Sequence, residues 1–238
     1  MAVLFLLLSS LLGMAATTSQ PQDYYVTAQM GLMETTGNSD SKTYDARLTT
    51  GYNFATVTLM ASGDYINTMA SGEDISYFWQ GQLRFEKEFL NEENRFFLSH
   101  KTEGEPFMGY IQRDSDDIGW QRLFMKSDTS LWLGEISFRY SKTQPQGPTV
   151  TVFEDSIRFY TSYEMTWASA WSAKGILEYI PQVSNDEYLL NAEAILERRL
   201  SSLLSLNLTY LLHYQSLPYN NVIESTATYT LFNMSAKF

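Results

Sequence analysis

Cysteine is absent from this chain of 238 residues. Its absence excludes disulfide bonds, thiolate metal sites, cysteine nucleophiles and the lipid anchor that bacteria attach to a cysteine. Basic side chains are also scarce, because 16 Lys and Arg stand against 27 Asp and Glu and give a net charge of −11. Since binding to nucleic-acid phosphates needs a basic surface, we expect no nucleic-acid partner.

Long hydrophobic runs are missing as well. A helix that crosses a membrane needs about 18 apolar residues, and no segment of the chain reaches that length. The longest run, Val3–Leu12, is typical of the apolar region of a secretory signal peptide, and the small residues Ala15 and Ala16 follow it. The expected divisions are a signal peptide at 1–16 cleaved near Ala15 or Ala16, a short lead at 17–23 and an exported domain at 24–238.

Alternation of apolar and polar side chains is what the chain has in abundance. It is clearest in Leu203–Ser216, where Leu204, Leu206 and Leu208 share one face with further apolar residues and the other face is polar. A helix would spread these residues around its whole surface, so the pattern indicates β-strands. The expected strands are Tyr24–Thr35, Lys42–Phe54, Thr56–Thr68, Ile75–Phe89, Arg95–Glu103, Tyr110–Met125, Leu131–Lys142, Val150–Met165, Ala170–Pro181, Glu187–Leu200, Leu203–Ser216 and Val222–Phe238.

The polar faces of these strands carry charges of both signs, which is typical of the lumen of a membrane barrel in which charges pair. We therefore predict an all-β fold: a single transmembrane, antiparallel, up-and-down β-barrel of about twelve strands. Turns at Asn91–Asn94 and Thr143–Pro148, and loops too short for a plug or an inserted helix, belong to this prediction. The residues predicted to line the lumen are Asp45, Arg47, Arg84, Glu86, Arg113, Glu135, Arg139, Glu154, Arg158, Glu193, Glu197, Arg199 and His213.

Aromatic residues make up 15% of the chain. On the apolar faces they gather near the strand ends, as the two aromatic girdles of a membrane barrel do. The residues predicted to lie at the membrane interfaces are Phe54, Trp79, Trp120, Trp132, Trp171, Tyr188, Tyr214 and Phe238. An even number of strands places both termini at one end, which we expect to be the periplasmic end.

The final strand ends on Phe238, as do the closing strands of bacterial outer-membrane barrels that the assembly machinery reads. With the turn Gly37-Asn38-Ser39-Asp40-Ser41 and the series of aromatic strands, the chain from Tyr24 onward resembles the YdiY-like outer-membrane proteins, DUF 481, which are known as salt-induced outer-membrane proteins. The resemblance implies a barrel in the bacterial outer membrane. The expected partners are membrane lipid, lipopolysaccharide and the barrel-assembly machinery.

Catalytic motifs are few. His100 falls on the apolar face of its strand, but its neighbour Ser99 must point to the other face and cannot act as its nucleophile. Asp114–Asp117 lacks the glycine and glutamate spacing of a calcium loop, so we expect no metal and no cofactor.

Three functions follow from these observations. The first is a small channel or envelope-stabilising protein that acts under osmotic or salt stress. The second is a structural or docking barrel of an envelope complex. The third, a lipid-modifying enzyme, rests on His100 alone, and we expect no enzymatic activity.

Overall fold

The computed structural model describes residues 24–35, 41–70, 72–147, 150–167, 170–217 and 225–238. The expected signal peptide at 1–16, the lead at 17–23 and the turn residues Gly37–Asp40 lie outside these ranges. Within them, no helix is long and apolar enough to cross a membrane.

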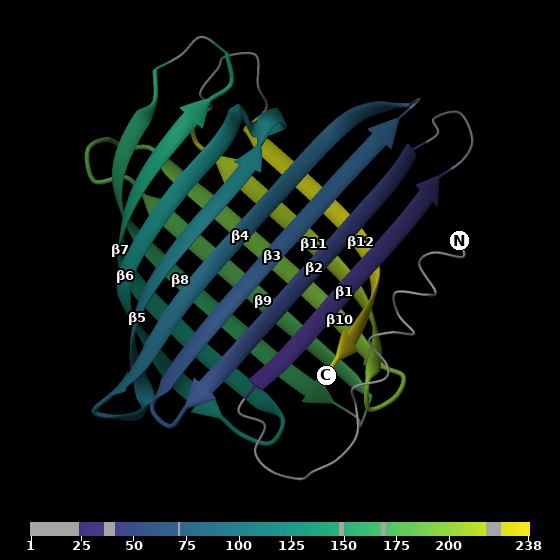
Figure 1. Cartoon of the computed structure of the whole chain (residues 1–238), viewed down its shortest axis with the longest axis vertical. Helices are drawn as coiled ribbons and strands as arrows, with labels where there is room; N and C mark the ends of the chain where they lie inside the picture. Colours follow the sequence, from purple (N-terminus) through teal and green to yellow (C-terminus); the bar gives the residue numbers. More distant parts are fainter. Residues whose placement is uncertain (1–23, 36–40, 71, 148–149, 168–169, 218–224) are drawn as a thin grey trace.

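The described residues form a closed barrel of antiparallel strands, so the predicted fold class is confirmed (Figure 1). Each strand pairs with the next in sequence, and β1 pairs with β12 to close the wall. The strands are β1 (Tyr24–Thr35), β2 (Ser41–Phe54), β3 (Val57–Ala70), β4 (Glu73–Phe89), β5 (Asn91–Glu105), β6 (Tyr110–Lys126), β7 (Ser130–Pro145), β8 (Val152–Trp167), β9 (Trp171–Pro181), β10 (Tyr188–Arg199), β11 (Leu204–Gln215) and β12 (Thr226–Lys237).

Three local expectations were wrong. Asn91–Asn94 is not a turn, because β5 begins at Asn91 and the chain reverses at Leu90, whose φ of 70° is left-handed. Thr143–Pro145 belongs to β7 rather than to the loop after it. A short 3-10 helix, η2 (Pro106–Met108), does fit between β5 and β6, and it buries Met108.

The distribution of polar and apolar side chains is inverted relative to a soluble barrel. Leu83 and Leu32, on the outward face, are 63% and 62% exposed, whereas the lumen residues Arg139 and Asp117 are each only 4% exposed. Alternate residues of one strand therefore meet two different environments, apolar outside and polar inside, as they do in a membrane barrel.

Large aromatic side chains form two bands on the outward face. One, the terminal band, lies near the end of the barrel that holds both β1 and β12 termini; it includes Phe54, Phe89, Phe124, Trp132 and Trp171. The other, the far band, lies toward the opposite end and includes Tyr65, Tyr77, Tyr140, Tyr179, Tyr188 and Tyr214. Rings of the far band touch across strands: the centroid distance is 5.6 Å for Tyr65 and Tyr77, and 5.7 Å for Tyr188 and Tyr214. An apolar wall between two aromatic bands matches the depth profile of a membrane.

The join between β1 and β12 is short. Thr27–Gly31 pairs with Asn233–Lys237, and Val26 and Phe238 exchange backbone hydrogen bonds of 3.2 and 2.8 Å. Every other join pairs a longer stretch, the next shortest being Phe159–Trp167 with Trp171–Tyr179.

Candidate functional site: the charged lumen

Alternating charges line one side of the lumen as a continuous chain of ion pairs. Arg84 Nη2 lies 2.7 Å from Glu135 Oε1, and Arg158 Nη1 lies 2.7 Å from the other oxygen of the same carboxylate. Arg158 also pairs with Glu178. Because each guanidinium is shared between two carboxylates, the buried charges are compensated where water is scarce.

Further contacts extend this chain at both ends, through Glu86 on one side and through Arg139, which lies 3.6 Å from Glu178, on the other. Arg84 Nε lies 2.7 Å from Glu86, and Arg95 lies 3.0 Å from Glu86 on the terminal side. Arg139 forms a bidentate pair with Asp117, with distances of 2.9 and 2.8 Å. Stacking supports the arrangement, because Arg84 Cζ lies 3.9 Å from the centroid of Phe97, which is fully buried in the lumen.

Some ion pairs join strands that are not neighbours in the wall. Arg47 on β2 lies 2.8 Å from Glu193 on β10, although β1, β12 and β11 separate the two strands. Arg47 Nε also lies 2.7 Å from Asp64 on the adjacent strand β3. Arg47 therefore crosses part of the lumen and narrows it.

Toward the far end, Glu105 is the centre of a second set of contacts. Its carboxylate accepts a hydrogen bond of 2.7 Å from Tyr229 and lies 2.9 Å from His213 Nδ1. β5 and β11, which carry Glu105 and His213, stand opposite each other in the barrel. Ser76 donates to the Tyr229 hydroxyl at 2.9 Å. These contacts bring opposite walls together.

An apolar cluster reinforces this closure. It consists of Ile66, Phe78, Leu211, Tyr229 and Leu231, from β3, β4, β11 and β12. The rings of Phe78 and His213 lie 5.0 Å apart. The far end of the lumen is therefore filled by side chains, which we call the far-end seal: this apolar cluster together with Glu105, His213 and Ser76.

A cavity of about 290 Å³ lies in the lumen beside these contacts. Both signs of charge line it, including Arg47, Asp64, Lys101, Glu103, Arg158 and Glu193. Lys101 and Glu103 pair at 2.8 Å. A cavity of this size holds water, hydrated ions or a small polar solute, and its mixed charges give it no overall sign preference.

The structure brings most of the residues predicted from the sequence to this lumen. Asp45, Arg113 and Arg158 are buried there, Glu154 accepts a hydrogen bond from Gln182, and Glu197 accepts one of 3.2 Å from Ser205. Arg199 is in phase with Glu193 and Glu197, at the terminal end of β10, where it is exposed and lies apart from the ion-pair network.

The predicted interface aromatics face outward. Phe54, Trp120 and Trp132 are 51%, 41% and 45% exposed. Trp171 lies with them toward the terminal end, where Arg198 stacks on it at 5.2 Å. Trp79, Tyr188 and Tyr214 lie toward the far end, and Phe238 lies at the β1 join.

Sequence reasoning missed several lumen residues. Asp64 pairs in register with Arg47 and precedes the outward residue Tyr65, and Glu178 lies between the outward residues Leu177 and Tyr179, so alternation within their own strands could have found both. Glu103, Glu105 and Asp117 lie on β5 and β6, where alternation is poor.

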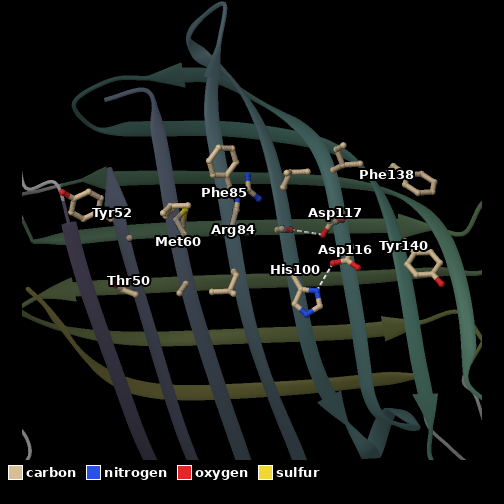
Figure 2. Close-up of a pocket in the computed structure, with 17 residues that line it drawn as sticks. Thr50, Tyr52, Met60, Arg84, Phe85, His100, Asp116, Asp117, Phe138 and Tyr140 are labelled. Atoms are coloured by element: carbon tan, nitrogen blue, oxygen red, sulfur yellow. Dashed lines mark hydrogen bonds and ion pairs between the residues drawn. The ribbon is translucent and has the colours of Figure 1, made fainter. Parts of the chain in front are cut away.

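His100 lies outside the lumen, on the outward face of β5. Its Nδ1 is 2.8 Å from Asp116 Oδ1, an acceptor that sequence reasoning did not identify (Figure 2). Ser99, by contrast, faces the lumen and donates to Asp117 at 3.3 Å. In the described part of the chain, no group of three or more His, Asp or Glu side chains is arranged to hold a metal ion.

Comparison with known proteins agrees with this architecture. The family model described as "Protein of unknown function, DUF481" matches residues 28–238. No curated protein matches the sequence. Among solved structures, the NanC porin superposes with a TM-score of 0.51 at 10% identity, covering 89% of this chain and 97% of the porin. An outer membrane channel from Pseudomonas putida F1 superposes with a TM-score of 0.50 at 7% identity, covering 93% and 99%. At these identities the likeness concerns the fold.

Proposed function

The chain belongs to the DUF481 family, and from its lumen we propose that it is a narrow, low-conductance channel of the bacterial outer membrane. The observation that carries this proposal is the charged cavity of about 290 Å³, which lies among side chains that cross the lumen. A barrel of about twelve strands is intermediate between filled eight-stranded barrels and open porins. Small ions and small polar solutes suit a passage of this kind.

The ion pairs across the lumen supply a physical link to salt stress. Arg47 and Glu193 are 27% and 13% exposed at their side chains, so dissolved ions reach them in part. Added salt screens exposed pairs and weakens their attraction. We propose that rising ionic strength loosens this crossing, which fits the resemblance to salt-induced outer-membrane proteins.

Conductance in planar bilayers tests the proposal. The purified, folded barrel should give small single-channel steps, and after correction for the conductivity of the solution these steps should grow between low and high KCl. A barrel that is inserted and folded but gives no steps at any salt concentration contradicts the channel.

The far-end seal favours a second candidate, a closed barrel that stabilises the envelope or docks a partner. Ile66, Phe78 and Tyr229 are each no more than 5% exposed and fill the lumen as a core would. A barrel that gives no conductance steps and co-purifies with a stoichiometric envelope protein would support this candidate over the channel.

We propose no enzymatic role. His100 has an orienting carboxylate in Asp116, but a hydrolase also needs a nucleophile within hydrogen-bond reach, and Ser99 faces the lumen. Lipid turnover by the wild type that disappears in His100→Ala would contradict this.

A further inference from the structure

A stripe of polar side chains runs up the outward face of β5 and β6. It begins with the His100–Asp116 pair, and next to it Thr102 donates to Asp114 at 2.8 Å. Gln112 also donates to Asp114 at 2.8 Å. The intervening residues, including Lys101 and Arg113, are buried in the lumen, so the stripe belongs to the membrane-facing surface.

The lower part of the stripe lies where the apolar belt meets the far band. Along β5 it is preceded by the outward residues Phe96 and Leu98, and Asp116 pairs in register with Tyr140 of the far band. The side chains of His100 and Asp116 are 52% and 66% exposed. Ionisable residues that face lipid at this depth are costly, so the pair needs a polar partner from the membrane or from another molecule.

A hollow of about 750 Å³ adjoins the pair on the same outer wall (Figure 2). Its outward lining is apolar and includes Ala61, Leu83, Leu98, Ile118 and Phe138. Ala61 is short, while Leu83 beside it on β4 stands 63% exposed, so the wall is recessed there. His100 and Asp116 form one edge of the hollow.

We propose that this hollow binds one lipopolysaccharide molecule of the outer leaflet. An acyl chain of its lipid A lies against Leu83, Leu98 and Ile118, and the hydroxyl and amide groups near the head of the chain meet His100 and Asp116. With Nδ1 directed at Asp116, His100 presents Nε2 to such a group, because Nε2 has no hydrogen-bond partner among the described residues.

The polar stripe continues in the direction of the lipid head group. Above the pair, Asp114 lies within electrostatic range of Lys142, which is exposed on β7 toward the far end. A bound lipid A places its phosphates at that height, where an ammonium group attracts them. The order of residues along the wall therefore complements the order of groups along lipid A. Apolar residues meet the acyl chain, His100 and Asp116 meet its hydroxyl and amide groups, and Lys142 meets the phosphates.

A recessed, apolar surface suits a slender acyl chain better than the wall of a second barrel. Two barrels meet through outward faces that are convex, and a concave hollow at the contact would stay unfilled. The lipid is therefore the occupant that these observations favour, and a second copy is an alternative that the experiment separates.

Native mass spectrometry of the purified barrel with added lipid A tests the proposal, with a phospholipid of similar acyl length as the comparison. Ala61→Trp fills the hollow and leaves the polar pair intact. The double variant His100→Leu/Asp116→Leu removes the pair and suits a lipid-facing wall. We expect the double variant to weaken lipid A binding by about tenfold, as the loss of one hydrogen-bonded anchor does. Ala61→Trp should weaken binding by a similar factor, because its ring takes the place of the acyl chain and removes the apolar area that the chain would bury.

The matched control is Ala194→Trp, which adds the same ring to the outward face of β10, on the other side of the barrel from the hollow. It should bind lipid A like the wild type, and all variants should show the gel shift of a folded barrel. Equal binding by Ala61→Trp and Ala194→Trp would overturn the proposal. So would equal binding of phospholipid and lipid A. A wild-type dimer that the double variant abolishes would assign the surface to a second copy instead.

Discussion

Arg47 and Glu193 lie 2.8 Å apart, although three strands separate β2 from β10 in the wall. Their ion pair holds two distant parts of the barrel together and occupies the space between them. The double variant Arg47→Ala/Glu193→Ala should therefore give a larger single-channel conductance than the wild type, because it removes the crossing without leaving either charge unpaired across the lumen. Planar-bilayer recordings measure this.

Its control is Arg199→Ala, since Arg199 lies exposed at the terminal end of β10, apart from the network. That variant should conduct like the wild type. Unchanged conductance in the double variant would show that the constriction lies elsewhere.

The same pair predicts a coupled effect on stability. Glu193→Ala alone leaves Arg47 with only Asp64, and we expect it to lower the free energy of unfolding by about 1–3 kcal/mol. The double variant should lose less than the sum of the two single variants, with a coupling energy of about 0.5–3 kcal/mol. Urea unfolding in lipid vesicles, followed by tryptophan fluorescence, supplies all four values. Strict additivity would mean that the two side chains do not interact.

We expect the stability of the barrel to depend more on the buried carboxylate of Glu105 than on an exposed acid. It is 1% exposed and accepts from Tyr229, while His213 lies 2.9 Å away. Glu105→Ala leaves buried polar groups without their acceptor, which costs about 1–3 kcal/mol of unfolding free energy for each group. Glu73→Ala, an exposed acid at the far end of β4, is the comparison and should stay within about 0.5 kcal/mol of the wild type.

Gly104 predicts a steric effect on the outer wall. A Cβ atom there would collide with Trp79 Nε1 and would lie 2.5 Å from the backbone oxygen of Ile111. Backbone cannot give way as a flexible side chain can, so Gly104→Ala should destabilise the barrel by about 1–3 kcal/mol. Gly81→Ala is the matched control, because its Cβ would come no closer than 3.8 Å to Thr102 Cγ2. Equal melting temperatures for the two variants would contradict this account.

Replacing Phe238 distinguishes a role of its ring in assembly from a role in stability. Phe238→Ala keeps the two backbone hydrogen bonds with Val26 but removes the ring that we propose the assembly machinery reads. Refolding of the purified variant into detergent should match the wild type. In cells, the amount of folded barrel in the outer membrane should fall. A fall in both experiments would mean that the ring mainly stabilises the join, and no fall in cells would remove the proposed recognition.

Alternation made most of the wall predictable. β1 was predicted with the bounds that the structure shows, and β11 to within one residue at each end, because apolar residues occupy successive outward positions over Tyr24–Leu32 and along the whole of β11. β5 and β6 were harder, because their outward faces carry His100 and Asp116 while the lumen face of β5 holds the apolar Phe97. Alternation weakens where the outer wall is polar, and this is also where the proposed lipid site lies.

Contacts across the lumen were beyond sequence reasoning. Which residue meets Glu105 depends on the strand number, the tilt of the strands and the shape of the cross-section together. A barrel with one more or one fewer pair of strands would place a different residue opposite Glu105. The charges of Arg47 and Glu193 were predicted to face the lumen, but nothing in the sequence selects them as partners.

The short join between β1 and β12 has a mechanical consequence. The join consists of Thr27–Gly31 paired with Asn233–Lys237 and the two backbone hydrogen bonds between Val26 and Phe238, so separating these strands breaks fewer backbone hydrogen bonds than separating any other neighbours. When the barrel is heated or stretched, we expect β1 and β12 to separate before any other pair of strands. We expect these two strands to pair last during folding. We also expect them to separate first during unfolding, so that the pairing of β1 with β12 sets the lifetime of the folded barrel.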